Sequence, residues 1–116
     1  MLSERGRRAL LGIIENVEAA QDFTADLSFE DFASNRLLLY GVTRCLEIIS
    51  EASRRLSSAA KARHPDVPWR LIAGAGNVYR HGYDSVTLDI VWLTVHDELP
   101  VLVAACRAEF ARAPDP

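Results

Sequence analysis

The chain has 116 residues, of which 49% are hydrophobic and 25% are charged, so it can bury one core in a single domain over residues 1–116. No apolar run reaches the about 18 residues of a membrane-spanning helix, and the charged N-terminus lacks a signal-peptide pattern, so we expect a cytoplasmic protein. The formal net charge of −3 is not that of a typical nucleic-acid-binding protein.

The two cysteines, Cys45 and Cys106, lie far apart within apolar patterns. This predicts small core residues rather than a disulfide. Because no Cys/His spacing resembles a zinc site, we expect neither a metal nor a cofactor.

Basic residues cluster in the middle of the chain despite the negative net charge: Arg54, Arg55, Lys61, Arg63, His64, Arg70 and Arg80. One interpretation is a local basic patch, and the more common one is a solvated helical face. His64 and His96 belong to no motif, and we expect both in solvent.

Apolar residues recur at steps of three and four in the first part of the chain, which is typical of helices. The spacing predicts a helix over residues 3–21 with Ser3 as its N-cap. A turn follows at 22–26. Ser28, with Asp31 three residues later, predicts a short capped helical turn over 28–32.

The longest predicted helix covers residues 35–63 and is the expected spine of the fold, ended by Pro65 and Pro68. Pro68 then starts the third helix, which reaches His81. Small residues at 73–76 make that helix weak by itself, so we expect close packing against another helix, within one chain or across a dimer.

A loop is predicted at 84–87, and the fourth helix over 88–111, where Pro100 should kink or divide it. No segment has a strand pattern. The sequence therefore predicts an all-α, up-and-down bundle of four main helices plus a short helical turn.

The third helix ends in the segment Asn77-Val-Tyr-Arg-His-Gly-Tyr83, which places an amide, an imidazole and a phenol close together. Asn77 and His81 are four residues apart and share a helical face. Gly82 favours a break before Tyr83. An imidazole titrates near neutral pH, so the segment is a candidate site for handling nucleotides.

Four blocks in order, at 44–52, 64–74, 77–83 and 89–100, give the chain a resemblance to the HepT-like proteins of the HEPN superfamily. The resemblance implies a HEPN-like bundle that acts as a homodimer and cleaves RNA without a metal. It also implies the toxin half of a bacterial, type VII-like toxin–antitoxin pair.

In such a pair, a minimal nucleotidyltransferase antitoxin (MntA-like) adds AMP to the motif tyrosine of the toxin. Carried over by position, Asn77 is the polar motif residue, His81 the catalytic histidine and Tyr83 the AMP acceptor. No membrane partner is implied.

The chain departs from the family motif at one position, since the arginine expected before Asn77 is replaced by Gly76. Arg80 and Arg70 are candidate substitutes or RNA contacts. Arg80 points roughly 100° away from His81, and Arg70 lies about 16 Å from His81 along the helix, so either would act across a dimer.

The replacement by Gly76 leaves two main hypotheses. The chain is an endoribonuclease, or it is a catalytically inactive, dimeric HEPN-type binding module. A helical adaptor with no link to nucleotides is a third reading.

Overall fold

The computed structural model describes residues 3–81 and 85–112, and for 77–81 and 85–87 it describes the backbone only. The described elements are α1 (Glu4–Thr24), α2 (Phe29–Ala33), α3 (Arg36–Ser53), α4 (Ser58–Ala62), α5 (Trp69–His81), α6 (Ser85–Leu93), the π-helical turn η1 (Thr94–Glu98) and α7 (Leu99–Ala111). No strand occurs within these ranges, so the predicted all-α class is confirmed.

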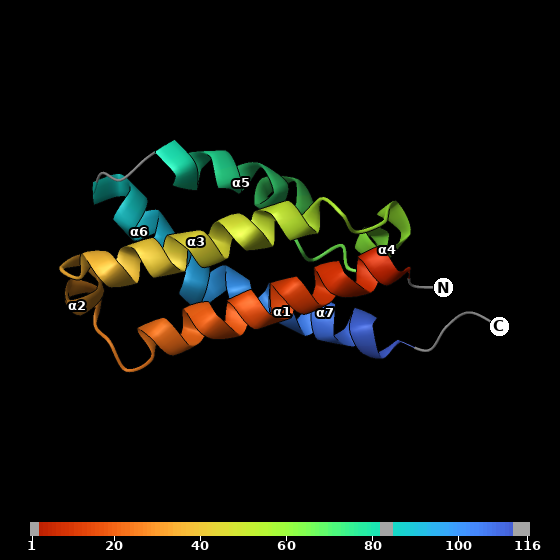
Figure 1. The fold of residues 1–116 in the computed structure, drawn as a ribbon, viewed down its shortest axis with the longest axis horizontal. Helices are drawn as coiled ribbons and strands as arrows, with labels where there is room; N and C mark the ends of the chain where they lie inside the picture. The colour runs from red at the N-terminus through yellow and green to blue at the C-terminus, as the bar shows by residue number, and fades with distance from the viewer. Residues whose placement is uncertain (1–2, 82–84, 113–116) are drawn as a thin grey trace.

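The long helices run up and down along one axis (Figure 1). α1 and α3 lie antiparallel, α5 returns along α3, and α7 packs against α1. Their apolar stripes meet in one contiguous core. The predicted stripe of the longest helix is buried at Val42, Cys45, Ile49, Ala52 and Leu56.

Side-chain caps fix the helix starts where the sequence predicted them. Ser3 Oγ accepts from Gly6 N–H at 2.9 Å, and Ser28 with Asp31 forms a complete capping box for α2. The predicted turn at 22–26 begins too early, because α1 continues to Thr24 and ends just before Asp26, whose φ is 61°.

The predicted helix over 35–63 is wrong in its length, because the chain breaks between α3 and α4. The N–H groups of Arg54, Arg55 and Leu56 each bond to the carbonyl three residues back, which tightens and ends the helix. Ser57 then caps α4, with its Oγ accepting from Ala60 N–H at 3.1 Å. Leu56 is buried, so the turn brings an apolar side chain into the core.

Pro68 and Pro100 act at helix starts. α5 runs from Trp69 to His81, the residues predicted for it, and the Pro68 carbonyl accepts from Ile72 N–H at 3.1 Å. Pro100 lies in the first turn of α7, and the π-helical turn η1 precedes it, so the fourth helix is divided as predicted. α6 begins at Ser85, so the loop predicted at 84–87 is wrong from that residue on.

Both cysteines are buried and unbonded, as predicted for core residues. Burial raises the pKa of the Cys106 thiol to about 12, with a further contribution from the charge of Glu109. Among the described helices, none has the length and apolar character needed to cross a bilayer.

A buried carboxylate ties the segment before α5 to α7. Glu109 on α7 is 5% exposed, and both of its oxygens accept from Arg63 Nε, at 3.0 and 3.2 Å. Arg63 Nη2 forms a further bond to it, and His64 Nε2 lies 2.9 Å from Oε2. The expectation that His64 is solvated is therefore wrong, because it pairs with a carboxylate 45 residues away in sequence.

The same segment holds the first residue of α5. Trp69 Nε1 donates to the carbonyls of Lys61 and His64, each at 3.1 Å. Glu109 thus fixes the 61–64 segment, and this segment fixes the position from which α5 starts.

We expect Glu109→Gln to lower the free energy of unfolding at pH 7 by about 1.5–3 kcal/mol, since hydrogen bonds to a charged group are lost. The hydrogen bonds from Arg63 hold the pKa of the Glu109 carboxyl below its ordinary value, against the opposing effect of burial. Its contribution is therefore complete above the unfolded-state pKa and is lost as the pH falls through the lower, folded-state pKa. Thermal or urea unfolding of both proteins across pH measures this.

Glu18→Gln is the matched control, because Glu18 pairs with Arg107 in the open, with both side chains about half exposed. This change should cost only about 0–1 kcal/mol. Equal losses for the two variants, or a Glu109→Gln loss that persists at low pH, would contradict the role of Glu109.

Candidate functional site

The predicted site residues lie at the C-terminal end of α5 and just beyond it. Asn77, Arg80 and His81 belong to the last turns of α5, but their side chains lie outside the described residues, as does Tyr83 entirely. Arg70 is exposed in the first turn of α5. The structure therefore describes the helix that carries these residues and the surroundings of the residue before them, Gly76.

Gly76 is buried where α5 packs against α3. Its N–H donates to Ser50 Oγ at 3.2 Å, and the Ser50 hydroxyl donates to the Ala73 carbonyl at 3.0 Å. A Cβ on residue 76 would lie 2.9 Å from Ser50 Oγ and 3.3 Å from Ser50 Cβ. The close packing predicted from the small residues occurs here within one chain.

This contact explains why position 76 carries no side chain. A Cβ contact of 2.9 Å forces a displacement, and Ser50 cannot turn away without losing both of its hydrogen bonds to α5. An arginine at position 76 would therefore displace the Ser50 side chain or move α5 away from α3. Gly76→Arg tests packing as well as activity and is not a clean way to restore a motif arginine.

A guanidinium from α3 lies against α5 beside Gly76. Arg54 Nε and Nη2 both donate to the Ala73 carbonyl, at 3.0 and 2.5 Å. The Arg54 side chain is exposed. No carboxylate forms an ion pair with it among the described residues.

The sequence placed Arg54 only in the basic cluster and did not single it out. A signal was available, because Arg54 follows Ser50 by four residues and so lies on the same face of α3. That signal becomes specific only when α5 is seen to pack on this face.

Glu47 and Glu51 flank the apolar stripe of α3 and pair with arginines of that same region. Glu47 lies 3.3 Å from Arg44 and Glu51 lies 3.4 Å from Arg55. Each glutamate thus pairs with an arginine close to it in sequence and not with a residue of α5. Pairs of this kind contribute little to stability.

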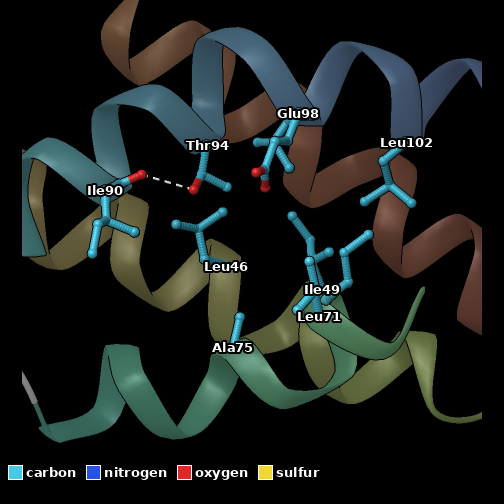
Figure 2. A pocket seen from close by; sticks show the side chains of 10 residues that line it. Leu46, Ile49, Leu71, Ala75, Ile90, Thr94, Glu98 and Leu102 are labelled. Carbon is cyan, nitrogen blue, oxygen red and sulfur yellow. Dashed lines mark hydrogen bonds between the residues drawn. The ribbon is translucent and has the colours of Figure 1, made fainter. Parts of the chain in front are cut away.

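The other flank of α5 borders an apolar cavity of about 190 Å³ (Figure 2). Its walls come from α3, α5, α6, η1 and α7, and include Leu46, Ile49, Leu71, Ala75, Ile90, Thr94, Glu98 and Leu102. Thr94 Oγ1 donates to the Ile90 carbonyl at 2.7 Å, and Glu98 is the charged residue of the wall. An apolar cavity with a carboxylate suits an apolar side chain better than a phosphate.

Within the described ranges, no three His, Cys, Asp or Glu side chains come together as metal ligands. The chemistry available around Gly76 is that of a hydroxyl, a guanidinium and backbone groups.

We expect two glycines on α5 to respond in opposite ways to alanine. Gly74 is exposed with no atom near its missing Cβ in the described part of the chain, so Gly74→Ala should stabilise by about 0.5–1 kcal/mol. Gly76→Ala should destabilise by about 1–3 kcal/mol through overpacking against Ser50. Urea denaturation of both variants measures the difference.

The Ser50→Gly/Gly76→Ala double variant is the control, because it removes both atoms that the new Cβ would meet. Its loss should be smaller than the sum of the two single losses. If Gly76→Ala is as stable as Gly74→Ala, the contact between α3 and α5 is not as close as described.

Comparison with known proteins adds an independent line of evidence. The family model described as "Ribonuclease HepT-like" matches residues 13–109, which covers most of the chain and all of α3 and α5. No solved structure matches the chain at a significant level.

Several relatives carry ribonuclease names. A Thermococcus cleftensis protein named "Probable ribonuclease HepT" is 37% identical over 90 residues, covering 78% of this chain and 82% of its own. A Methanocaldococcus jannaschii protein named as a candidate RNase is 33% identical over 100 residues, covering 85% and 92%. Another candidate RNase, from Caldanaerobacter subterraneus, is 36% identical over 90 residues, covering 78% and 80%. The chain, with its all-α bundle, belongs to the HepT-like ribonuclease family.

Proposed function

We propose that this chain is a metal-independent endoribonuclease and the toxin component of a type VII-like toxin–antitoxin pair. The observation that carries the proposal is the family match over residues 13–109, which includes the segment Asn77 to His81 at the end of α5. The names of the relatives support the ribonuclease class. The antitoxin and the AMP acceptor are finer proposals that rest on the motif.

In the proposed reaction the ribose 2′-oxygen gives its proton to a base and bonds to the neighbouring phosphorus, while the bond from phosphorus to the 5′-oxygen of the next nucleotide breaks. The leaving 5′-oxygen takes a proton from an acid, and the other product carries a 2′,3′-cyclic phosphate. His81 serves as general acid or base, since an imidazole can take or give a proton near neutral pH. Asn77 orients the phosphate from the preceding turn of the helix. Negative charge develops on the phosphoryl oxygens, and a nearby guanidinium would stabilise it.

The protein is proposed to act as a homodimer in which two copies of α5 approach each other. Exposed apolar side chains on α5 and α6 support this, because Leu71 of α5 is 74% exposed and Leu93 at the end of α6 is 56% exposed. Burial of such side chains by a second copy would remove apolar area from water.

We expect His81→Ala to reduce the rate of RNA cleavage by about 10²–10⁴-fold, which is the usual contribution of a general acid or base. The measurement is single-turnover cleavage of a labelled RNA by the purified protein in the presence of EDTA. His96→Ala is the matched control, since His96 is exposed on η1, outside α5. Cleavage by His81→Ala at the rate of the parent chain would contradict the assignment of His81.

A catalytically inactive binding module is the second candidate function, and Gly76 is the observation that favours it. In this candidate, the packing of α5 on α3 around Ser50 stabilises the fold although the motif arginine is absent. Expression in a host without the antitoxin separates the two functions. Growth arrest that depends on His81 supports the ribonuclease, and a harmless parent chain supports the binding module.

We expect coexpression with an MntA-like minimal nucleotidyltransferase to add the mass of AMP to the chain. Tyr83→Phe should remove the added mass, because it lacks the acceptor hydroxyl. Intact-mass spectrometry measures this, and Tyr79→Phe is the control, as a second tyrosine of the same segment. An unmodified parent chain, or equal labelling of Tyr83→Phe, would count against Tyr83 as the acceptor.

A further inference from the structure

We propose that Arg54, the C-cap residue of α3, contacts the phosphate of the RNA substrate and supplies the guanidinium that position 76 of α5 lacks. The inference rests on the proposed ribonuclease function and deepens it. Its basis is the placement of one side chain on another helix.

The guanidinium of Arg54 is anchored on one edge and free on the other. Nε and Nη2 donate to the Ala73 carbonyl, at 3.0 and 2.5 Å. A guanidinium has five N–H donors in a planar fork, so the Nη1 end keeps its donors. No other hydrogen bond of the Arg54 side chain is found in the part of the chain that the structure describes. A planar donor pair on an anchored group suits a phosphate.

The charge of Arg54 is also available. Two other arginines of this region of the chain, Arg44 and Arg55, are each paired with a glutamate. The group that holds Arg54 is a neutral carbonyl, which orients the guanidinium without cancelling its charge. An anion that approaches this surface therefore meets an unneutralised cation.

The anchor places this cation at the level of the motif. A helix carbonyl points along the axis toward the N–H four residues later, so the Ala73 oxygen lies near the level of Asn77. His81 is one further turn along, about 6 Å in axial rise. This axial spacing leaves room for one phosphate beside the two helical turns.

The packing at Gly76 explains why this cation comes from α3. Ser50 occupies the space where a side chain from position 76 would begin. Ser50 also bonds the same Ala73 carbonyl that holds Arg54. The close contact at Gly76 thus disfavours a side chain at position 76, and Arg54 bonds to α5 one turn before it.

The test compares Arg54→Gln with Arg55→Gln in the full-length protein. Both variants lose one positive charge from adjacent exposed positions, but Arg55 pairs with Glu51 and has no bond to α5. We expect single-turnover RNA cleavage to fall about 10²–10³-fold for Arg54→Gln, as for the loss of one charged or oriented donor. Arg55→Gln should cleave like the parent chain. Arg54→Lys, which keeps the charge without the fork, should fall between them.

A second readout separates a phosphate contact from a structural bond. Binding of a 2′-O-methyl RNA oligonucleotide, which lacks the nucleophile, is measured by fluorescence polarisation at increasing salt. Loss of one phosphate contact should reduce the slope of log K against log salt by about 0.7 for single-stranded RNA. A bond that only joins α3 to α5 would lower the melting temperature and leave this slope unchanged.

The outcomes distinguish the inference from the function on which it rests. If the parent chain cleaves RNA and Arg54→Gln matches Arg55→Gln in rate and slope, the inference is wrong and the ribonuclease stands. If the parent chain binds but does not cleave, and Arg54→Gln alone reduces the slope, Arg54 is a phosphate contact of a binding module. A rate loss without a change in slope makes Arg54 a structural bond. A parent chain that neither binds nor cleaves RNA overturns both.

Discussion

The close approach of α5 to α3 at Gly76 is the constraint on which the candidate site depends. Ser50 accepts a hydrogen bond from the Gly76 N–H and donates one to the Ala73 carbonyl, so the hydroxyl joins two points of α5 one turn apart. The approach is close because residue 76 has no Cβ. It also brings the Arg54 guanidinium onto the same carbonyl. Packing and charge at the site thus arise from one interface.

A second interaction, far along the bundle axis, fixes where α5 begins. The buried carboxylate of Glu109 holds Arg63 and His64, and the carbonyls of Lys61 and His64 accept the indole N–H of Trp69. α5 is therefore held at its start by charge and near its centre by close packing. Between these points its other flank borders the apolar cavity, where Leu71 is exposed. Because α5 is held at two places, the position of its C-terminal turns is fixed relative to the bundle. A preorganised site requires such a rigid support.

The helices were predictable because their signals are local. Apolar spacing, the caps Ser3 and Ser28, and the prolines at 68 and 100 act within a few residues of their own position. The break at 54–57 was not predictable from spacing, because the apolar stripe continues through it to Leu56. That break follows from burial of Leu56 and capping by Ser57. How much each of these stabilises the break depends on the tertiary packing around it. The pairing of His64 with Glu109 spans 45 residues and has no local signal.

The sequence by itself determined the all-α class, the family resemblance and the position of Asn77, His81 and Tyr83 around the end of one helix, since motif order and periodicity are properties of the chain. It also showed that the residue before Asn77 is glycine. Only the tertiary structure showed the packing role of that glycine. Gly76 is the point where α5 contacts Ser50, and Arg54 reaches the Ala73 carbonyl of α5 from a position 19 residues earlier in sequence. Contacts between distant residues depend on how helices pack, and no spacing within a single helix encodes them.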